Sequence, residues 1–154
     1  MKQNSTIKEQ SLNPQSSVRP KAQPAGEELD ERVLAALHAA GEKKAIEPVV
    51  LDLRDIASFT DYFVILSGAN ERQVQAISDE VYEQLKKSGH AAARVEGYKT
   101  AEWILLDYGD FVVHVFEQKA RKFYDLERLW RESKRVQLPA EFSTDSGSSL
   151  RRES

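Results

Sequence analysis

Apolar residues recur along this chain with two spacings, one typical of helices and one typical of strands. A spacing of three to four residues predicts helices at 29–40, from Asn70 to Gly89, and at 119–131. Short β-branched or aromatic runs predict five strands, at 49–53, 62–67, 94–96, 103–106 and 111–116. Asn70 and Gln73 have the spacing of a capping box, which supports a helix start there. The predicted order is therefore α-β-β-α-β-β-β-α.

The two longest apolar runs, Tyr62–Leu66 and Phe111–Phe116, are apolar at consecutive positions. Strands of that kind are buried on both sides, so we expect helices on both faces of the sheet. The helix between the second and third strands permits a parallel crossover, and the turn at 107–110 requires an antiparallel hairpin. The fold class predicted is α/β, with a mixed five-stranded sheet.

Aromatic residues mark the limits of the folded part. Twelve of the thirteen aromatic residues lie between Phe59 and Trp130. On the last predicted helix, we expect Phe123, Leu126 and Trp130 to share the face that packs on the core. Residues 1–26 are rich in Ser, Gln and Pro and contain no aromatic residue, a composition that does not support a core. We therefore predict a disordered tail at 1–28, one domain at 29–131 and a mostly disordered tail at 132–154.

Composition excludes several classes of protein. The 154 residues carry a net charge of −3 and no Cys, so disulfides and thiolate metal sites are excluded. No apolar run approaches the ~20 residues that span a bilayer, and the first ten residues lack a secretory signal. His38, His90 and His114 are not spaced along the sequence as the ligands of a metal ion usually are. We expect a soluble cytoplasmic protein with no metal, no cofactor and no membrane partner.

Catalytic motifs are also missing. There is no G-x-S-x-G elbow, P-loop or dinucleotide fingerprint. Nucleotidyltransferases need two carboxylates two positions apart on one strand, but the two such pairs, Glu28/Asp30 and Asp125/Glu127, fall at or in expected helices. The Ser67–Gly68 turn precedes a helix N-terminus, which favours an anion, although a tight turn alone would also need glycine. We predict no enzyme, with a nucleotide-binding or nucleotidyltransferase-like enzyme at Ser67–Gly68 as the alternative.

The remaining candidate is a protein-binding surface. Residues 29–131 contain 14 basic and 18 acidic residues, so we do not expect the protein to bind nucleic acid in a sequence-specific way. Lys119, Arg121 and Lys122 are interpreted as solvated charges of the last helix. Trp103 lies at a strand end and Tyr124 lies off the core stripe. Large aromatics in such places are typical interface anchors, although Trp103 could equally belong to the core. An acidic module should prefer a basic protein.

Five segments of the sequence resemble the ribosomal silencing factor family, RsfS, which is also called Iojap or YbeB. They are TDYFVILSG at 60–68, QVQAI at 73–77, VEG at 95–97, WILLDYGDFVVHVF at 103–116 and RKFYDLERLW at 121–130. The resemblance implies a fold similar to the nucleotidyltransferase fold without its catalytic acids. It also implies a homodimer when the protein is free.

The same resemblance implies a function and a partner. Members of the family bind the large ribosomal subunit at its intersubunit face, on the basic large-subunit ribosomal protein number fourteen. This binding blocks association with the small subunit and represses translation under nutrient limitation. Position by position, the resemblance assigns the partner contacts to Trp103 as apolar anchor, Asp107 and Glu127 as mates of Arg or Lys, and His114 and Tyr124 as polar-tipped contacts. From the residues alone, His114 is as well explained as a partly buried, hydrogen-bonded histidine.

Overall fold

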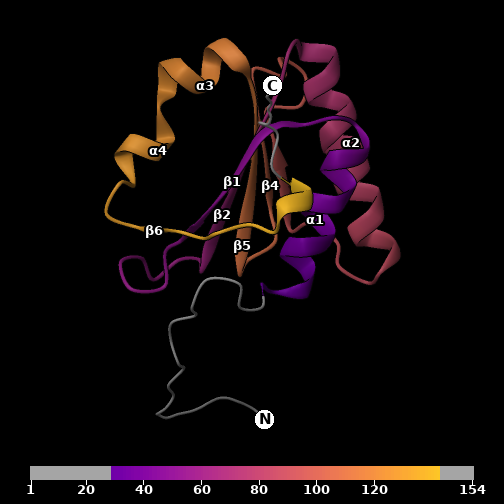
Figure 1. The fold of residues 1–154 in the computed structure, drawn as a ribbon. Coiled ribbons are helices and arrows are strands. Elements are labelled where there is room, and N and C mark those ends of the chain that lie inside the picture. The colour runs from indigo at the N-terminus through magenta and orange to yellow at the C-terminus, as the bar shows by residue number, and fades with distance from the viewer. Residues whose placement is uncertain (1–28, 143–154) are drawn as a thin grey trace.

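The computed structural model describes residues 29–142, which form a mixed α/β sheet with helices on both faces (Figure 1). The helices are α1 (Glu31–Glu42), α2 (Glu71–Lys87), α3 (Gln118–Tyr124), α4 (Leu126–Leu129) and the 3-10 turn η3 (Ala140–Phe142). The strands are β1 (Ile46–Asp52), β2 (Tyr62–Gly68), β3 (Arg94–Glu96), β4 (Trp103–Asp107), β5 (Phe111–Glu117) and β6 (Lys134–Arg135). The predicted fold class is confirmed.

The strands lie in the order β3-β4-β5-β2-β1-β6. β4 and β5 form the predicted antiparallel hairpin. Only β2 and β5 pair in parallel, so the parallel crossover that α2 permits joins β2 to the fifth strand and not to the third, which lies at the edge of the sheet. The prediction of five strands was wrong, because β6 adds a sixth at the outer edge of β1. Lys134 and Arg135 are both polar, so no hydrophobic pattern marks this strand.

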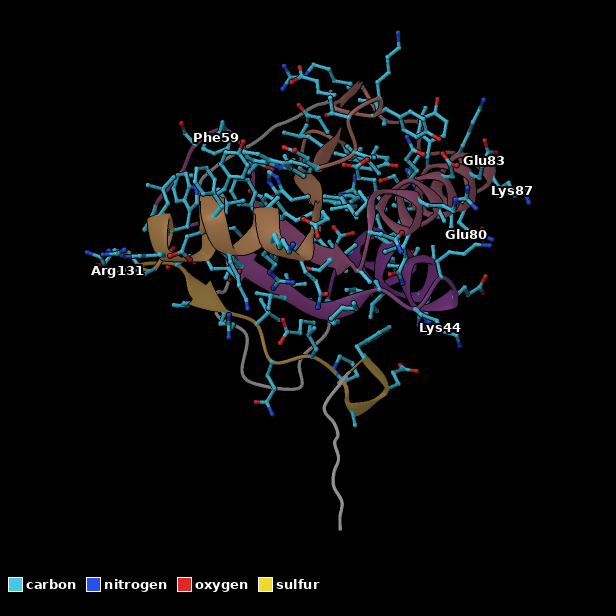
Figure 2. The ribbon with its side chains drawn as sticks, turned by 90° about the horizontal axis from the view of Figure 1, so that it is seen from above. Lys44, Phe59, Glu80, Glu83, Lys87 and Arg131 are labelled. Atoms are coloured by element: carbon cyan, nitrogen blue, oxygen red, sulfur yellow. The ribbon has the colours of Figure 1, made fainter. Side chains whose placement is uncertain are left out.

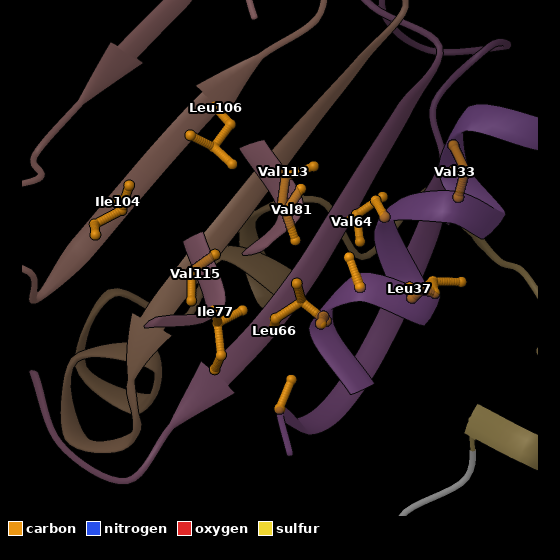
Figure 3. Close-up of a cluster of buried hydrophobic side chains, with 14 of the residues drawn as sticks. Val33, Leu37, Val64, Leu66, Ile77, Val81, Ile104, Leu106, Val113 and Val115 are labelled. Atoms are coloured by element: carbon orange, nitrogen blue, oxygen red, sulfur yellow. The ribbon is translucent and has the colours of Figure 1, made fainter. Parts of the chain in front are cut away.

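One face of the sheet is covered completely by α1 and α2, and their apolar stripes interdigitate with the strand side chains (Figure 3). Asp30 caps α1 by accepting from Arg32 N at 2.8 Å. Asn70 caps α2 as predicted, since its Oδ1 accepts from Gln73 N at 2.8 Å. Gln73 also reaches back, but its Oε1 accepts from Ala69 N at 2.7 Å and not from the N-cap residue itself, so the capping box is displaced by one residue. The buried side chains include Val33, Leu37, Val64, Leu66, Ile77, Val81, Ile104, Leu106, Val113 and Val115. Each contributes about 1.5–3 kcal/mol by leaving water.

The opposite face is covered only in part, by the short helices α3 and α4 (Figure 1). The single helix predicted at 119–131 was wrong, because Asp125 adopts a left-handed conformation (φ 49°) that separates α3 from α4. The change of direction also breaks the predicted core stripe. Leu126 is buried, but Phe123 is 80% exposed.

The chain continues in contact with the core past residue 131, where the predicted domain ends. Val136 N donates to Val50 O at 2.9 Å, and Val136 and Leu138 pack against the core beneath α1. Phe142 is buried, with its ring centroid 4.9 Å from that of His38. In Figure 1 this yellow segment runs from α4 across the sheet to α1. The tail predicted at 1–28 and residues 143–154 of the tail predicted at 132–154 lie outside the described residues.

Candidate partner-binding surface

Aromatic side chains gather on the sheet face that α3 and α4 leave partly open. In the β4–β5 ladder Trp103 is opposite Phe116 and Leu105 is opposite His114. Alternation places these four side chains on the same face. We call the whole group the aromatic cluster: Phe59, Phe63, Trp103, His114, Phe116, Tyr124 and Trp130.

Trp103 lies at the middle of this cluster and is held on three sides. Its indole Nε1 donates to His114 Nδ1 at 3.0 Å, and its ring stacks on Phe116 with centroids 4.9 Å apart. The Tyr124 ring lies 4.9 Å away on the third side. The side chain is only partly buried. Trp103 therefore lies at the edge of the core, with part of its side chain exposed to solvent.

His114 is almost completely buried, and burial lowers its pKa to about 3. The imidazole is therefore neutral at physiological pH. Because Nδ1 accepts the Trp103 hydrogen bond, the ring hydrogen must reside on Nε2. Nε2 is buried and has no hydrogen-bond partner among the described residues, and the Phe63 ring packs against the imidazole at 4.4 Å between centroids. This geometry suits a residue that orients the Trp103 indole through its buried hydrogen bond.

Exposed apolar side chains surround the cluster. Tyr124 is 46% exposed, and Phe59 and Leu129 also present most of their surface to solvent. Phe123 packs edge-on against Tyr124 at 5.0 Å. A contiguous group of exposed rings next to a half-buried Trp is typical of a surface that another protein covers.

Asp107 lies on the same sheet face as Trp103, at the opposite end of β4. Its carboxylate pairs with Arg94 at 3.3 Å and accepts from Gly109 N at 2.9 Å. The ion pair is exposed, and such pairs stabilise a fold by less than about 1 kcal/mol. The Asp107 carboxylate therefore stabilises the hairpin turn, as its position at the end of β4 suggests, and part of it remains exposed to solvent.

Glu127 does not join the cluster. It pairs with Arg121 at 3.1 Å and with Arg135 at 3.0 Å. Burial alone would raise the pKa of Glu127, but the hydrogen bonds and charge of Arg121 outweigh it and hold the pKa below its usual range. Arg121 is itself buried and donates to Glu47 O at 2.8 Å and Ser67 Oγ at 2.9 Å. Glu127 is thus committed to an ion pair that anchors α3 to the ends of β1 and β2.

Four members of the cluster were not among the predicted site residues: Phe59, Phe63, Phe116 and Trp130. The alternation of β2 and β5 could have placed Phe63 and Phe116 on the face of His114. Phe59 precedes β2 in a loop, and Trp130 follows α4, so no periodicity connects either of them to the cluster.

The glycine of the Ser67–Gly68 turn is explained by packing. A Cβ on Gly68 would lie 3.0 Å from Val74 N, because β2 and α2 approach each other closely there. At the start of α2, the side chain of Asn70 accepts from Gln73 N and its carbonyl oxygen accepts from Val74 N. Within residues 29–142 no group of three His, Asp or Glu side chains could hold a metal ion. No helix in the same range is long and apolar enough to cross a bilayer.

Comparison with known proteins agrees with this geometry. The family model described as "Ribosomal silencing factor during starvation" matches residues 26–153. This chain belongs to that family. The ribosomal silencing factor RsfS of Halalkalibacterium halodurans is 42% identical over 103 residues, which cover 67% of this chain and 88% of that protein. RsfS of Bacillus subtilis strain 168 is 40% identical over 98 residues, covering 64% of this chain and 83% of that protein.

Solved structures support the fold of this silencing factor. A crystal structure of a protein from Chromobacterium violaceum matches with a TM-score of 0.65 and 33% identity, covering 71% of this chain and 88% of that one. Family membership confirms the resemblance seen in the sequence. The family model spans the strands and helices that carry the aromatic cluster.

Proposed function

We propose that this protein silences translation without catalysis, by binding the large ribosomal subunit at its intersubunit face and excluding the small subunit. Its contact there is the basic large-subunit ribosomal protein number fourteen. In this proposal the protein represses translation in the cytoplasm when nutrients are limited. The observation that carries the proposal is the half-buried Trp103, oriented by His114 and Tyr124 on the open face of the sheet.

The net charge of the domain supports a basic partner. Residues 29–131 contain 18 Asp or Glu and 14 Lys or Arg, a net charge of −4. Complementary charge speeds encounter and excludes wrong partners, while a desolvated aromatic anchor supplies much of the affinity. In this arrangement Trp103 and Tyr124 enter the interface, His114 holds the indole in place, and Asp107 meets a partner Arg or Lys. Glu127 contributes through the Arg121 ion pair that fixes α3.

The same exposed rings account for a homodimer of the free protein. Two copies that cover each other's aromatic cluster would remove Phe59, Phe123 and Tyr124 from water. Each large side chain so buried contributes about 1.5–3 kcal/mol. In this proposal the dimer and the ribosomal complex compete for one surface.

Co-sedimentation with purified large subunits at near-physiological salt tests the proposal. We expect Trp103→Ala to weaken binding at least about tenfold, which corresponds to about 1.4 kcal/mol. Since Trp103 also supports the core, Tyr124→Ala serves as a second variant, with an expected loss of about threefold or more and a native circular dichroism spectrum. Tyr82→Ala, on α2 and therefore on the opposite side of the sheet, is the matched control and should bind normally.

A second measurement tests the mechanism. Light scattering should show that the wild-type protein slows the joining of small to large subunits and that Tyr124→Ala does so less. Failure of the wild-type chain to sediment with large subunits would refute the proposal. Normal subunit joining in the presence of saturating protein would refute the exclusion mechanism.

A further inference from the structure

Positive charge is concentrated at one end of the described chain. Residues 119–135 contain seven Lys or Arg and three Asp or Glu, a net charge of +4, whereas residues 29–118 have a net charge of −7. Such a separation of charge within one domain is unusual for side chains that only keep a helix soluble.

Six exposed cations lie on or beside α3, α4 and β6, and we call them the basic surface: Lys119, Lys122, Arg128, Arg131, Lys134 and Arg135. Lys134 lies at its margin, because its side chain and that of Arg135 point to opposite faces of β6. Figure 2 shows Arg131 at one side of the molecule and Glu80, Glu83 and Lys87 of α2 at the other.

Most of these cations have no partner within the protein. Arg135 pairs with Glu127 and Lys134 pairs loosely with Asp55 at 3.7 Å. Lys119, Lys122, Arg128 and Arg131 form no salt bridge with any residue in the range 29–142. Their charges are therefore available to an external anion.

The basic surface is also hollowed. A cleft of about 720 Å³ opens between α3 and the segment that follows β6, and Lys119, Lys122 and Arg135 line it. Of its three carboxylates, Glu127 is already paired with Arg121 and Arg135, which leaves Glu47 and Asp125 to oppose the lysines. Phe123, next to Lys122 on α3, is 80% exposed.

We propose that the basic surface binds the sugar–phosphate backbone of RNA, without reading its sequence. The unpaired Lys119 and Lys122 at the cleft suit a chain of phosphates that continues past Arg128 and Arg131 outside it. The exposed ring of Phe123, next to Lys122, can stack on a base. An acidic protein would also be attracted, but it would give the exposed Phe123 ring no base on which to stack. The inference goes beyond the proposed function, which uses the aromatic cluster. Since α3 carries both Tyr124 and Lys122, one ribosomal site could engage both surfaces.

Fluorescence anisotropy with the full chain and a labelled oligouridine of about 20 nucleotides tests the inference over a series of salt concentrations. The test variant is Lys122→Glu/Arg128→Glu/Arg131→Glu. The matched control is Arg72→Glu/Lys86→Glu/Lys87→Glu, which makes the same change of charge on α2. We expect the test variant to bind at least about tenfold more weakly at about 100 mM salt, with a salt slope lower by about two to three. The control should lose less than about threefold.

Three outcomes would overturn the inference: no saturable RNA binding at low salt, equal losses in the two triple variants, or tighter binding of poly-L-glutamate than of RNA. The last result would identify an acidic protein as the partner. The Trp103→Ala variant separates this inference from the proposed function. It should keep its affinity for free RNA but lose its affinity for large subunits. A protein that sediments with large subunits and binds no free RNA would refute only the inference.

Discussion

Protonation of His114 should destabilise this protein steeply below pH 6.5. The side chain has a pKa of about 3 when folded, because burial disfavours its charged form, and about 6.5 when unfolded. Between these values the unfolded state binds more protons, so the free energy of unfolding falls as the pH falls. Linkage gives a loss of about 0.2 kcal/mol at pH 7 and about 2 kcal/mol at pH 5, relative to high pH.

Urea unfolding at pH 7, 6 and 5 measures this effect. With a urea dependence of about 1–3 kcal/mol per M, the midpoint should fall by about 0.7–2 M between pH 7 and pH 5. The matched variant is His114→Asn, whose amide oxygen can accept the Trp103 indole hydrogen but does not titrate. Its midpoint should change little over the same range, even if the variant is less stable at every pH.

Other ionisable groups do not produce the same signal. Burial alone would raise the pKa of Asp30 and of Asp52, but hydrogen bonds and ion pairs with Arg32 and Arg54 outweigh it and hold both values below the ordinary range. These carboxylates lose their contribution only well below pH 5, and both proteins retain them. If wild type and His114→Asn lose equal stability between pH 7 and pH 5, the reasoning from burial is wrong.

Two further changes test the packing. Gly97→Ala should lower the free energy of unfolding by at least about 2 kcal/mol, because Gly97 has a φ of 81° and a Cβ there would overlap the Trp103 carbonyl oxygen. Gly41→Ala, with open space around the residue, should be neutral or stabilising in the same urea experiment. Phe142→Ala should lower the free energy of unfolding by about 3 kcal/mol if the segment after β6 holds the domain together, whereas Leu129→Ala, at an exposed position, should lower it by less than about 0.5 kcal/mol. Equal urea midpoints for these two variants would show that the segment is dispensable.

The local pattern predicted the main elements well, since their signals come from neighbouring residues. The cap at Asn70 and the apolar strands β2 and β5 follow directly from residue order. The sequence permits a parallel crossover at α2, but only the fold selects β5 as the parallel partner of β2. The failures are β6 and the break between α3 and α4. β6 is a strand only because β1 offers it hydrogen bonds, and Asp125 turns left-handed in a stretch whose spacing is otherwise helical.

The candidate site divides in the same way. Residue type and position singled out Trp103 and Tyr124, the family resemblance added His114, and the structure brings these three together. The resemblance also assigned Glu127 to the site, but its carboxylate is held by Arg121 and Arg135. Trp130 was expected in the core of the last helix, whereas Phe59 joined the cluster without any sequence signal.

The amino-acid sequence by itself determined which segments are helix or strand, which strand faces are apolar, and the family to which the chain belongs, because each of these depends on residue identity and short-range spacing. Tertiary structure alone decided which polar groups are neutralised inside the protein and which stay free. An ion pair such as Arg121–Glu127, or a row of unpaired cations such as Lys122 and Arg131, depends on how helices are oriented against the sheet, and charge has no periodicity that reveals that orientation in advance.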